Sequence, residues 1–161
     1  MFHGRVVLMT WYFVSLRIAR MSFRDKYTDL IRRHLGRDPR HSDGVSEAAL
    51  AKCERRLDIR LPPAVREYYL MAGRLDQLNR AHNSLYAPDE LRIDDGHLWF
   101  MEENQAVVHW GLPVKRLAED DPIVYQRANV EGARWYSQRM RFSTFLIRVY
   151  DWQAGFAKPP A

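Results

Sequence analysis

Paired carboxylates are the residues of this sequence with the clearest chemical potential. Two carboxylates can serve as acid and base when their surroundings hold their pKa values apart. Such adjacent pairs include Asp94-Asp95, Glu102-Glu103 and Asp120-Asp121. Neighbouring residues in strands or turns usually point apart or into water. We therefore interpret the pairs as solvated surface or as part of a partner-binding patch, and we expect no catalytic residue. The patch comprises Asp94, Asp95, Glu102, Glu103, Asn104, Gln105, Asp120 and Asp121.

The other reactive residue types lack the spacing that metal or nucleotide chemistry requires. The six histidines show no HExxH pattern, and the sequence contains no GxxxxGK[ST] phosphate loop. Cys53 is the only cysteine, which excludes an internal disulfide and a multi-cysteine metal site. It lies in a helical pattern, which favours a buried thiol over a reactive one. We therefore expect no metal, cofactor or small-molecule substrate, and a cytoplasmic location.

Charge is distributed unevenly along the 161 residues. Although the net charge is +5, residues 1–40 hold nine Arg or Lys against three acids, whereas residues 89–121 hold nine acids against three bases. The acidic segment would repel a nucleic-acid backbone, so we do not expect nucleic acid as the partner. A basic nucleic-acid-binding arm remains the alternative, built from Arg17, Arg20, Arg24, Lys26, Arg32 and Arg33.

Residues 1–21 form an N-terminal extension. Its apolar run, residues 6–16, follows Arg5 but lacks a small-x-small cleavage site and is shorter than the ~20 residues that span a bilayer. Three interpretations stay open: a start codon at Met21, a peripheral helix or strand, and a targeting role. We expect no membrane association, one domain over residues 22–155 and a short tail at 156–161.

Apolar spacing predicts helices at both ends of this domain. Residues three and four apart, with fitting cap residues, predict helices over 22–36, 46–57 and 62–73. Ser143 can cap a final helix in which Phe145, Leu146, Val149 and Trp152 lie on one side.

The middle of the domain changes to a period of two. Residues 97–101 and 107–110 predict two antiparallel strands joined by 102–105, and residues 123–126 and 134–136 predict two shorter ones. The fold class is therefore α+β, a small mixed or mostly antiparallel sheet flanked by helices. Trp99, Trp110 and Trp135 are core residues or interface anchors.

Several motifs occur together in the order that is typical of one family. Residues 54–62 (ERRLDIRLP) fit E-x-x-L-x-x-x-L-P, and residues 100–111 (FMEENQAVVHWG) fit F-x-E-E-N-Q-x-V-x-x-W-G. Residues 121–125 (DPIVY), Trp135-Tyr136 and the last helix follow. Over residues 46–152 the sequence resembles the SUKH (Smi/Knr-like) superfamily, although Ala72 stands where many members have Asn.

This resemblance implies a specific role. Bacterial SUKH proteins are typically immunity proteins of polymorphic toxin systems, so the resemblance implies a cofactor-free, non-enzymatic protein that binds and neutralises a cognate toxin domain. Superfamily relatives also include regulators of fungal cell-wall synthesis, so a regulatory scaffold is a further alternative. If the toxin is a nuclease, the acidic segment could enter its basic channel.

Overall fold

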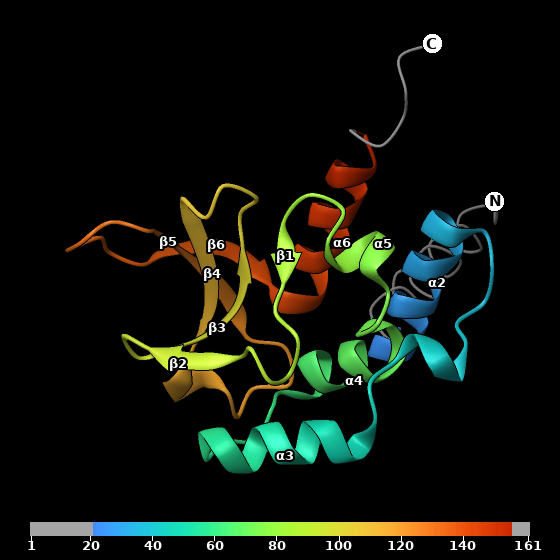
Figure 1. The fold of residues 1–161 in the computed structure, drawn as a ribbon, viewed down its shortest axis with the longest axis horizontal. Coiled ribbons are helices and arrows are strands. Elements are labelled where there is room, and N and C mark those ends of the chain that lie inside the picture. The colour runs from blue at the N-terminus through green and yellow to red at the C-terminus, as the bar shows by residue number, and fades with distance from the viewer. Residues whose placement is uncertain (1–20, 156–161) are drawn as a thin grey trace, which may run out of the picture.

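The computed structural model describes residues 21–155. The expectations for residues 1–20 and 156–161 therefore lie outside the described residues. Helices form the first half of the domain: α2 (Phe23–Leu35), α3 (Glu47–Leu57), α4 (Pro63–Ala72) and the single turn α5 (Asp76–Asn79), with a 3₁₀ turn, η1, at His41–Asp43 (Figure 1). The three helices predicted here are confirmed, and α5 was not predicted.

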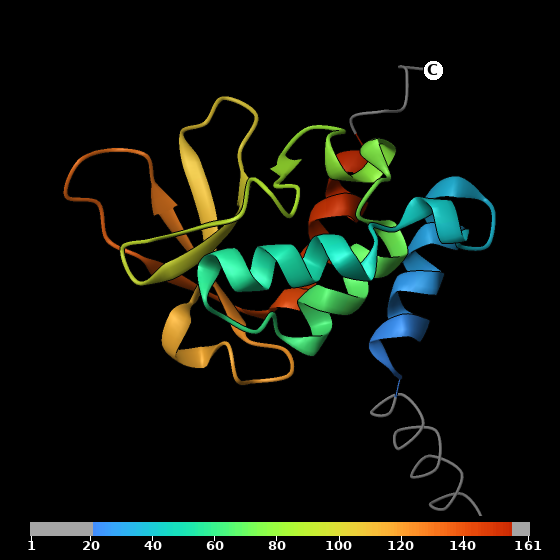
Figure 2. The ribbon, with the colours of Figure 1, turned by 60° about the horizontal axis from the view of Figure 1, so that its bottom comes forward.

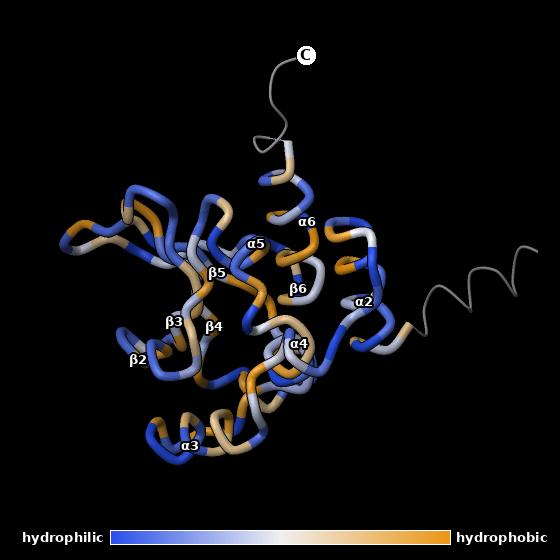
Figure 3. Tube along the Cα trace, turned by 45° about the vertical axis from the view of Figure 1, so that its right-hand side comes forward, coloured by the Kyte–Doolittle hydropathy of each residue, from blue (hydrophilic) through white to orange (hydrophobic). Residues whose placement is uncertain are grey.

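The helix ends follow the cap residues. Ser22 and Asp25 form a capping box at the start of α2, and Gly36 ends that helix in the left-handed conformation (φ 64°). The Ser46 hydroxyl accepts a hydrogen bond from the backbone N–H of Ala49 in α3. Pro63 is the first residue of α4, where its missing N–H leaves no hydrogen bond unmade. In Figure 3 the helices carry hydrophobic and hydrophilic sides, as amphipathic helices packed on a core should.

Within residues 21–155, six antiparallel strands form one sheet. They are β1 (Ser84–Leu85), β2 (Arg92–Asp94), β3 (His97–Glu102), β4 (Val108–Pro113), β5 (Ile123–Ala128) and β6 (Tyr136–Arg141), with a second 3₁₀ turn, η2, at Val114–Arg116. The order is β1-β3-β4-β5-β6, and β2 also pairs with β3. The α+β prediction with a mostly antiparallel sheet is confirmed. The last strand lies further along the chain than predicted, and β1 and β2 were not predicted.

The C-terminal helix α6 (Phe142–Ala154) packs between the sheet and the other helices. On the sheet side, the ring of Phe100 in β3 contacts Phe142 and Phe145, with centroids 5.1 and 6.0 Å apart. On the helix side, the buried hydroxyls of Tyr68 and Tyr150 both donate to Asn79 Oδ1, at 2.7 and 3.0 Å. The core therefore joins an aromatic cluster to a buried polar network.

One prediction about α6 was wrong. Arg141, not Ser143, occupies the N-cap position, and Ser143 is a buried residue of the first turn. Phe145, Val149 and Trp152 follow one another at helical spacing along the edge of the buried side, and Trp152 at the end of this row is 53% exposed.

One loop approaches the end of α4 very closely. The backbone N–H of Val45 donates to Tyr69 O (2.9 Å), and that of Arg74 donates to Asp43 O (2.8 Å). Between them, a Cβ on Gly44 would lie 1.6 Å from Leu70 O. Only glycine leaves room for this contact, which fixes the point from which α3 runs toward the sheet (Figure 2).

Candidate partner-binding site

The eight residues predicted for the partner-binding patch do not lie together. Asp94 and Asp95 lie at the turn between β2 and β3, whereas residues 102–105 form the hairpin at the other end of β3. These ends are roughly 15 to 20 Å apart, because a strand rises about 3.3 Å per residue. Asp120 and Asp121 precede β5 near α4, where Asp120 O accepts from Ala64 N. The acidic segment therefore forms three separate groups.

Asp121 is a structural residue rather than a surface contact. Only 7% of it is exposed. Its Oδ1 accepts from the backbone N–H of Ser143 (2.9 Å) and its Oδ2 from the Ser143 hydroxyl (2.6 Å). These bonds satisfy a donor of the first turn of α6, which is the role usually taken by an N-cap side chain.

Replacing Asp121 with alanine is expected to lower the free energy of unfolding by about 2 to 3 kcal/mol, because a buried N–H and a buried hydroxyl lose their acceptor. Urea denaturation measures the change. Asp120→Ala is the matched control, since Asp120 is exposed, and it should change stability by less than about 0.5 kcal/mol. Equal losses in the two variants would contradict the capping role.

Asp95, in the turn between β2 and β3, contacts the loop that precedes β6 and a side chain of β5. Its Oδ2 accepts from Trp135 Nε1 (2.9 Å) and lies 3.7 Å from Arg127 Nη1. The Trp135 ring stacks on His97 with centroids 4.0 Å apart and meets Trp99 edge-on at 5.7 Å. We call this side of the sheet, opposite the side that contacts α6, the outer face.

Arginine side chains cover the outer face. The guanidinium of Arg92 lies 4.6 Å from the ring centroid of Trp99, and that of Arg127 lies 5.9 Å from it. Trp99 is 5% exposed and donates from Nε1 to Asp94 O. The Tyr86 hydroxyl donates to Glu102 Oε2 (3.0 Å). Trp99 is therefore a packing residue, and Asp95 and Glu102 serve the fold through defined contacts.

His109 sits on this face between Trp99 and Tyr86. It is 3% exposed, and Tyr86 Oη lies 3.4 Å from its Nδ1. Burial lowers its pKa, which nearby Arg92 and Arg127 lower further and Glu102 partly restores. Burial also lowers the pKa of His97. These environments favour neutral imidazoles that pack in the sheet.

The domain is expected to lose stability as the pH falls from about 7 to about 5. The unfolded chain takes up protons near the ordinary histidine pKa of about 6.5, whereas folded His109 and His97 take them up only at lower pH. Acid therefore favours the unfolded state. His109→Asn should flatten the pH dependence of the free energy of unfolding, by about 1 kcal/mol per pKa unit removed. Exposed His41→Asn is the control, and an unchanged slope in His109→Asn would contradict the assignment.

The surface best suited to a partner is an apolar groove between α6 and the sheet, with a volume of about 380 Å³. Its walls are apolar side chains from both elements and its rim is polar. The lining residues are Asn83, Glu103, Trp110, Gln138, Met140, Phe145, Arg148, Val149 and Trp152. Asn83 is 3% exposed, and its Oδ1 has no hydrogen-bond partner.

The groove includes one residue of the predicted patch, Glu103. Asn104 and Gln105 are exposed in the same hairpin, where Glu103 Oε2 accepts from Gln105 N (2.9 Å). Trp110, one of the tryptophans left open between core and interface, contacts Phe145 at 5.7 Å and lines the groove. Sequence reasoning missed Asn83, Gln138 and Arg148. The helical spacing of Phe145, Val149 and Trp152 was the available signal, but it predicted only that these residues share one side of the helix.

Within residues 21–155 no group of three or more His, Cys, Asp or Glu side chains could hold a metal ion. In the same range, no helix is both long and apolar enough to cross a membrane. The groove itself contains one carboxylate and one guanidinium among mostly apolar side chains. The arrangement is suited to binding an apolar side chain with a charged neighbour.

Comparisons with known proteins found no match among family models, curated proteins or solved structures. The resemblance to the SUKH superfamily therefore stays a prediction that rests on the motifs quoted above.

Proposed function

We propose that this chain is a SUKH-like immunity protein, which binds a cognate toxin domain and blocks its action without chemistry of its own. The observation that carries the proposal is the groove beside α6, where an apolar cavity opens next to the half-exposed ring of Trp152. Tryptophan is enriched among residues that dominate binding energy at protein interfaces. An exposed tryptophan beside an apolar cavity is therefore a suitable anchor for a partner.

Charge on the hairpin side of the groove favours a basic contact, whereas Arg148 lines the helix side. Glu103 lines the groove on the hairpin side, and Asn104 and Gln105 extend the exposed polar tip. An apolar anchor with Glu103 on its hairpin side would complement a toxin surface that carries a Lys or Arg beside an apolar side chain. Such complementarity mainly accelerates association. It fits a nuclease toxin, whose substrate channel is basic.

The main alternative, a basic nucleic-acid-binding arm, has weaker support. The described arginines of the proposed arm are paired with carboxylates: Arg24 with Glu67 (2.8 Å), Arg32 with Asp38 (2.6 Å) and Arg33 with Asp151 (3.0 Å). Lys26 donates to Ser143 Oγ (3.3 Å). Such surface pairs add little stability, but they reduce the charge that is free to contact phosphate. Arg17 and Arg20 lie outside the described residues.

The direct test is co-expression with a toxin domain encoded in a neighbouring reading frame, if one is found there, scored for rescue of growth and followed by measurement of binding. The wild-type chain should restore growth and bind the toxin domain. Glu103→Lys should slow association at low salt several-fold while leaving the fold intact. Glu131→Lys, an exposed charge reversal at the β5–β6 turn, is the matched control.

A wild-type chain that neither binds nor rescues would overturn the immunity assignment. Normal association by Glu103→Lys would remove only the hairpin from the contact surface. A regulatory scaffold predicts binding to a protein that is not a toxin, so the identity of the bound partner separates that alternative.

A further inference from the structure

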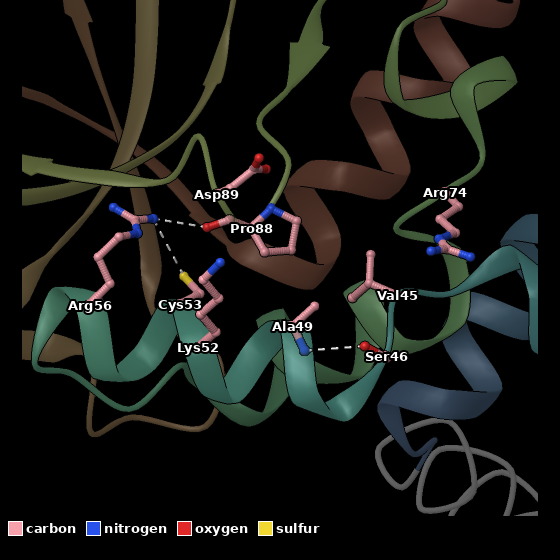
Figure 4. A pocket seen from close by; sticks show the side chains of 9 residues that line it. All are labelled: Val45, Ser46, Ala49, Lys52, Cys53, Arg56, Arg74, Pro88 and Asp89. Carbon is pink, nitrogen blue, oxygen red and sulfur yellow. Dashed lines mark hydrogen bonds between the residues drawn. The ribbon is translucent and has the colours of Figure 1, made fainter.

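A second cavity, of about 270 Å³, lies between α3 and the segment that precedes β2 (Figure 4). None of its residues belongs to the groove beside α6. Helix α3 supplies one wall, and Pro88 and Asp89 supply the facing wall. The lining residues are Val45, Ser46, Ala49, Lys52, Cys53, Arg56, Arg74, Pro88 and Asp89.

Arg56 holds the two walls of this cavity together. Its Nη2 donates to Pro88 O (3.0 Å) and Leu91 O (2.8 Å) and lies 4.0 Å from Cys53 Sγ. The segment that faces α3 is thus tied to the helix by charge-assisted hydrogen bonds, which are stronger than neutral ones. The cavity is a built feature of the fold.

Two further cations, Lys52 and Arg74, line the cavity. Within residues 21–155, neither Lys52 nor Arg74 forms a side-chain hydrogen bond or ion pair, and Asp89 is the only carboxylate in the lining. Figure 4 shows Arg74 beside Val45 and Ser46, with Lys52 further along α3 beside Cys53. The lining therefore carries an excess of positive charge.

The start of α3 adds to this positive environment. Ser46 Oγ accepts from Ala49 N (3.2 Å), which leaves the hydroxyl hydrogen of Ser46 able to donate to a ligand. The N-terminal end of a helix carries partial positive charge from its aligned peptide dipoles. Arg74, Ser46 and the first turn of α3 thus present donors on the same side of the cavity.

The rest of the lining is uncharged. Val45, Ala49 and Pro88 contribute apolar surface. Burial raises the pKa of Cys53, so this residue remains a neutral thiol. A ligand that matches these walls combines a negative group with a small apolar body.

We propose that this cavity is a binding site for a small organic anion, whose carboxylate or phosphate contacts Arg74 and Ser46 while its body lies over Ala49 and Pro88. Lys52 provides a second positive contact. The proposal does not depend on the immunity function, since the cavity and the groove share no residue.

The test is a ¹H–¹⁵N NMR titration of the full chain with inorganic phosphate and, separately, with succinate, at constant ionic strength. We expect saturable shifts confined to residues 45–53, Arg74 and residues 88–89. Arg74→Ala should weaken binding at least about tenfold, as expected for loss of a charged hydrogen bond. Lys52→Ala should weaken it less, and the double variant should show no saturable shifts.

Arg55→Ala and Arg60→Ala are the matched controls, because both arginines are exposed on or beside the same helix and neither lines the cavity. Binding of only one of the two anions still supports the site and identifies the ligand's chemistry. Absence of localised shifts with both anions, the same shifts with chloride alone, or unchanged binding by the double variant would each overturn the proposal.

Discussion

Replacing Gly44 with alanine is expected to destabilise the domain by more than about 3 kcal/mol, since it forces a buried overlap that no side-chain rotation can relieve. The new Cβ would lie 1.6 Å from the backbone oxygen of Leu70. Retreat of the loop would break the hydrogen bonds from Val45 N to Tyr69 O and from Arg74 N to Asp43 O. The substitution therefore costs either a steric overlap or two backbone hydrogen bonds.

Urea denaturation followed by circular dichroism measures this loss. Ser42→Ala is the control, because Ser42 lies exposed in the same segment. A Gly44→Ala variant within about 1 kcal/mol of the wild type would show that the loop does not approach α4 as described.

Replacing Trp152 with alanine should weaken binding of the cognate toxin domain by about 30-fold or more, which corresponds to a hot-spot loss of about 2 kcal/mol. Trp152 is 53% exposed and touches His82 edge-on at 5.4 Å, so about half of this residue can contact a partner. The same exposure limits its contribution to folding, and we expect the free energy of unfolding to change by less than about 1 kcal/mol.

Isothermal titration calorimetry against the toxin domain measures the affinity. Val130→Ala serves as the control, because Val130 is 63% exposed and lies outside the groove. If Trp152→Ala binds as tightly as Val130→Ala and the wild type, the groove is not the contact surface, even though the toxin remains the partner.

Local sequence patterns were sufficient to predict the long helices that have cap residues. The spacing of apolar residues with Ser22, Ser46 and Gly36 predicts α2 and α3 correctly, because these caps act within their own helices. Strand β1 has two residues and β2 has three, which is too few for a period to appear. The start of α6 was misplaced because the buried position of Ser143 depends on Asp121, which lies 22 residues away.

The candidate site was harder to predict because it also depends on contacts between residues that lie far apart in the sequence. Residues 94–105 are close in sequence, but β3 carries them to opposite ends of the sheet. The groove instead draws on segments around residues 83, 103–110, 138–140 and 145–152. Only the tertiary fold brings these segments together. The period of two predicts strand β3 but not its burial on both faces. Leu98, Trp99, Phe100 and Met101 are all buried, because arginine and tryptophan side chains cover the outer face.

Both edges of the sheet are poorly suited to pairing with a strand of another chain. One edge is divided between β1 and β2, which pair with different ends of β3. At the other, β6 has an irregular register with β5, and Arg139 takes a positive φ of 53°. Short, interrupted and positively charged border strands discourage intermolecular strand pairing. A partner would then be recognised through side chains that enter the groove, and not through strand pairing. Purified protein should also resist aggregation by strand pairing.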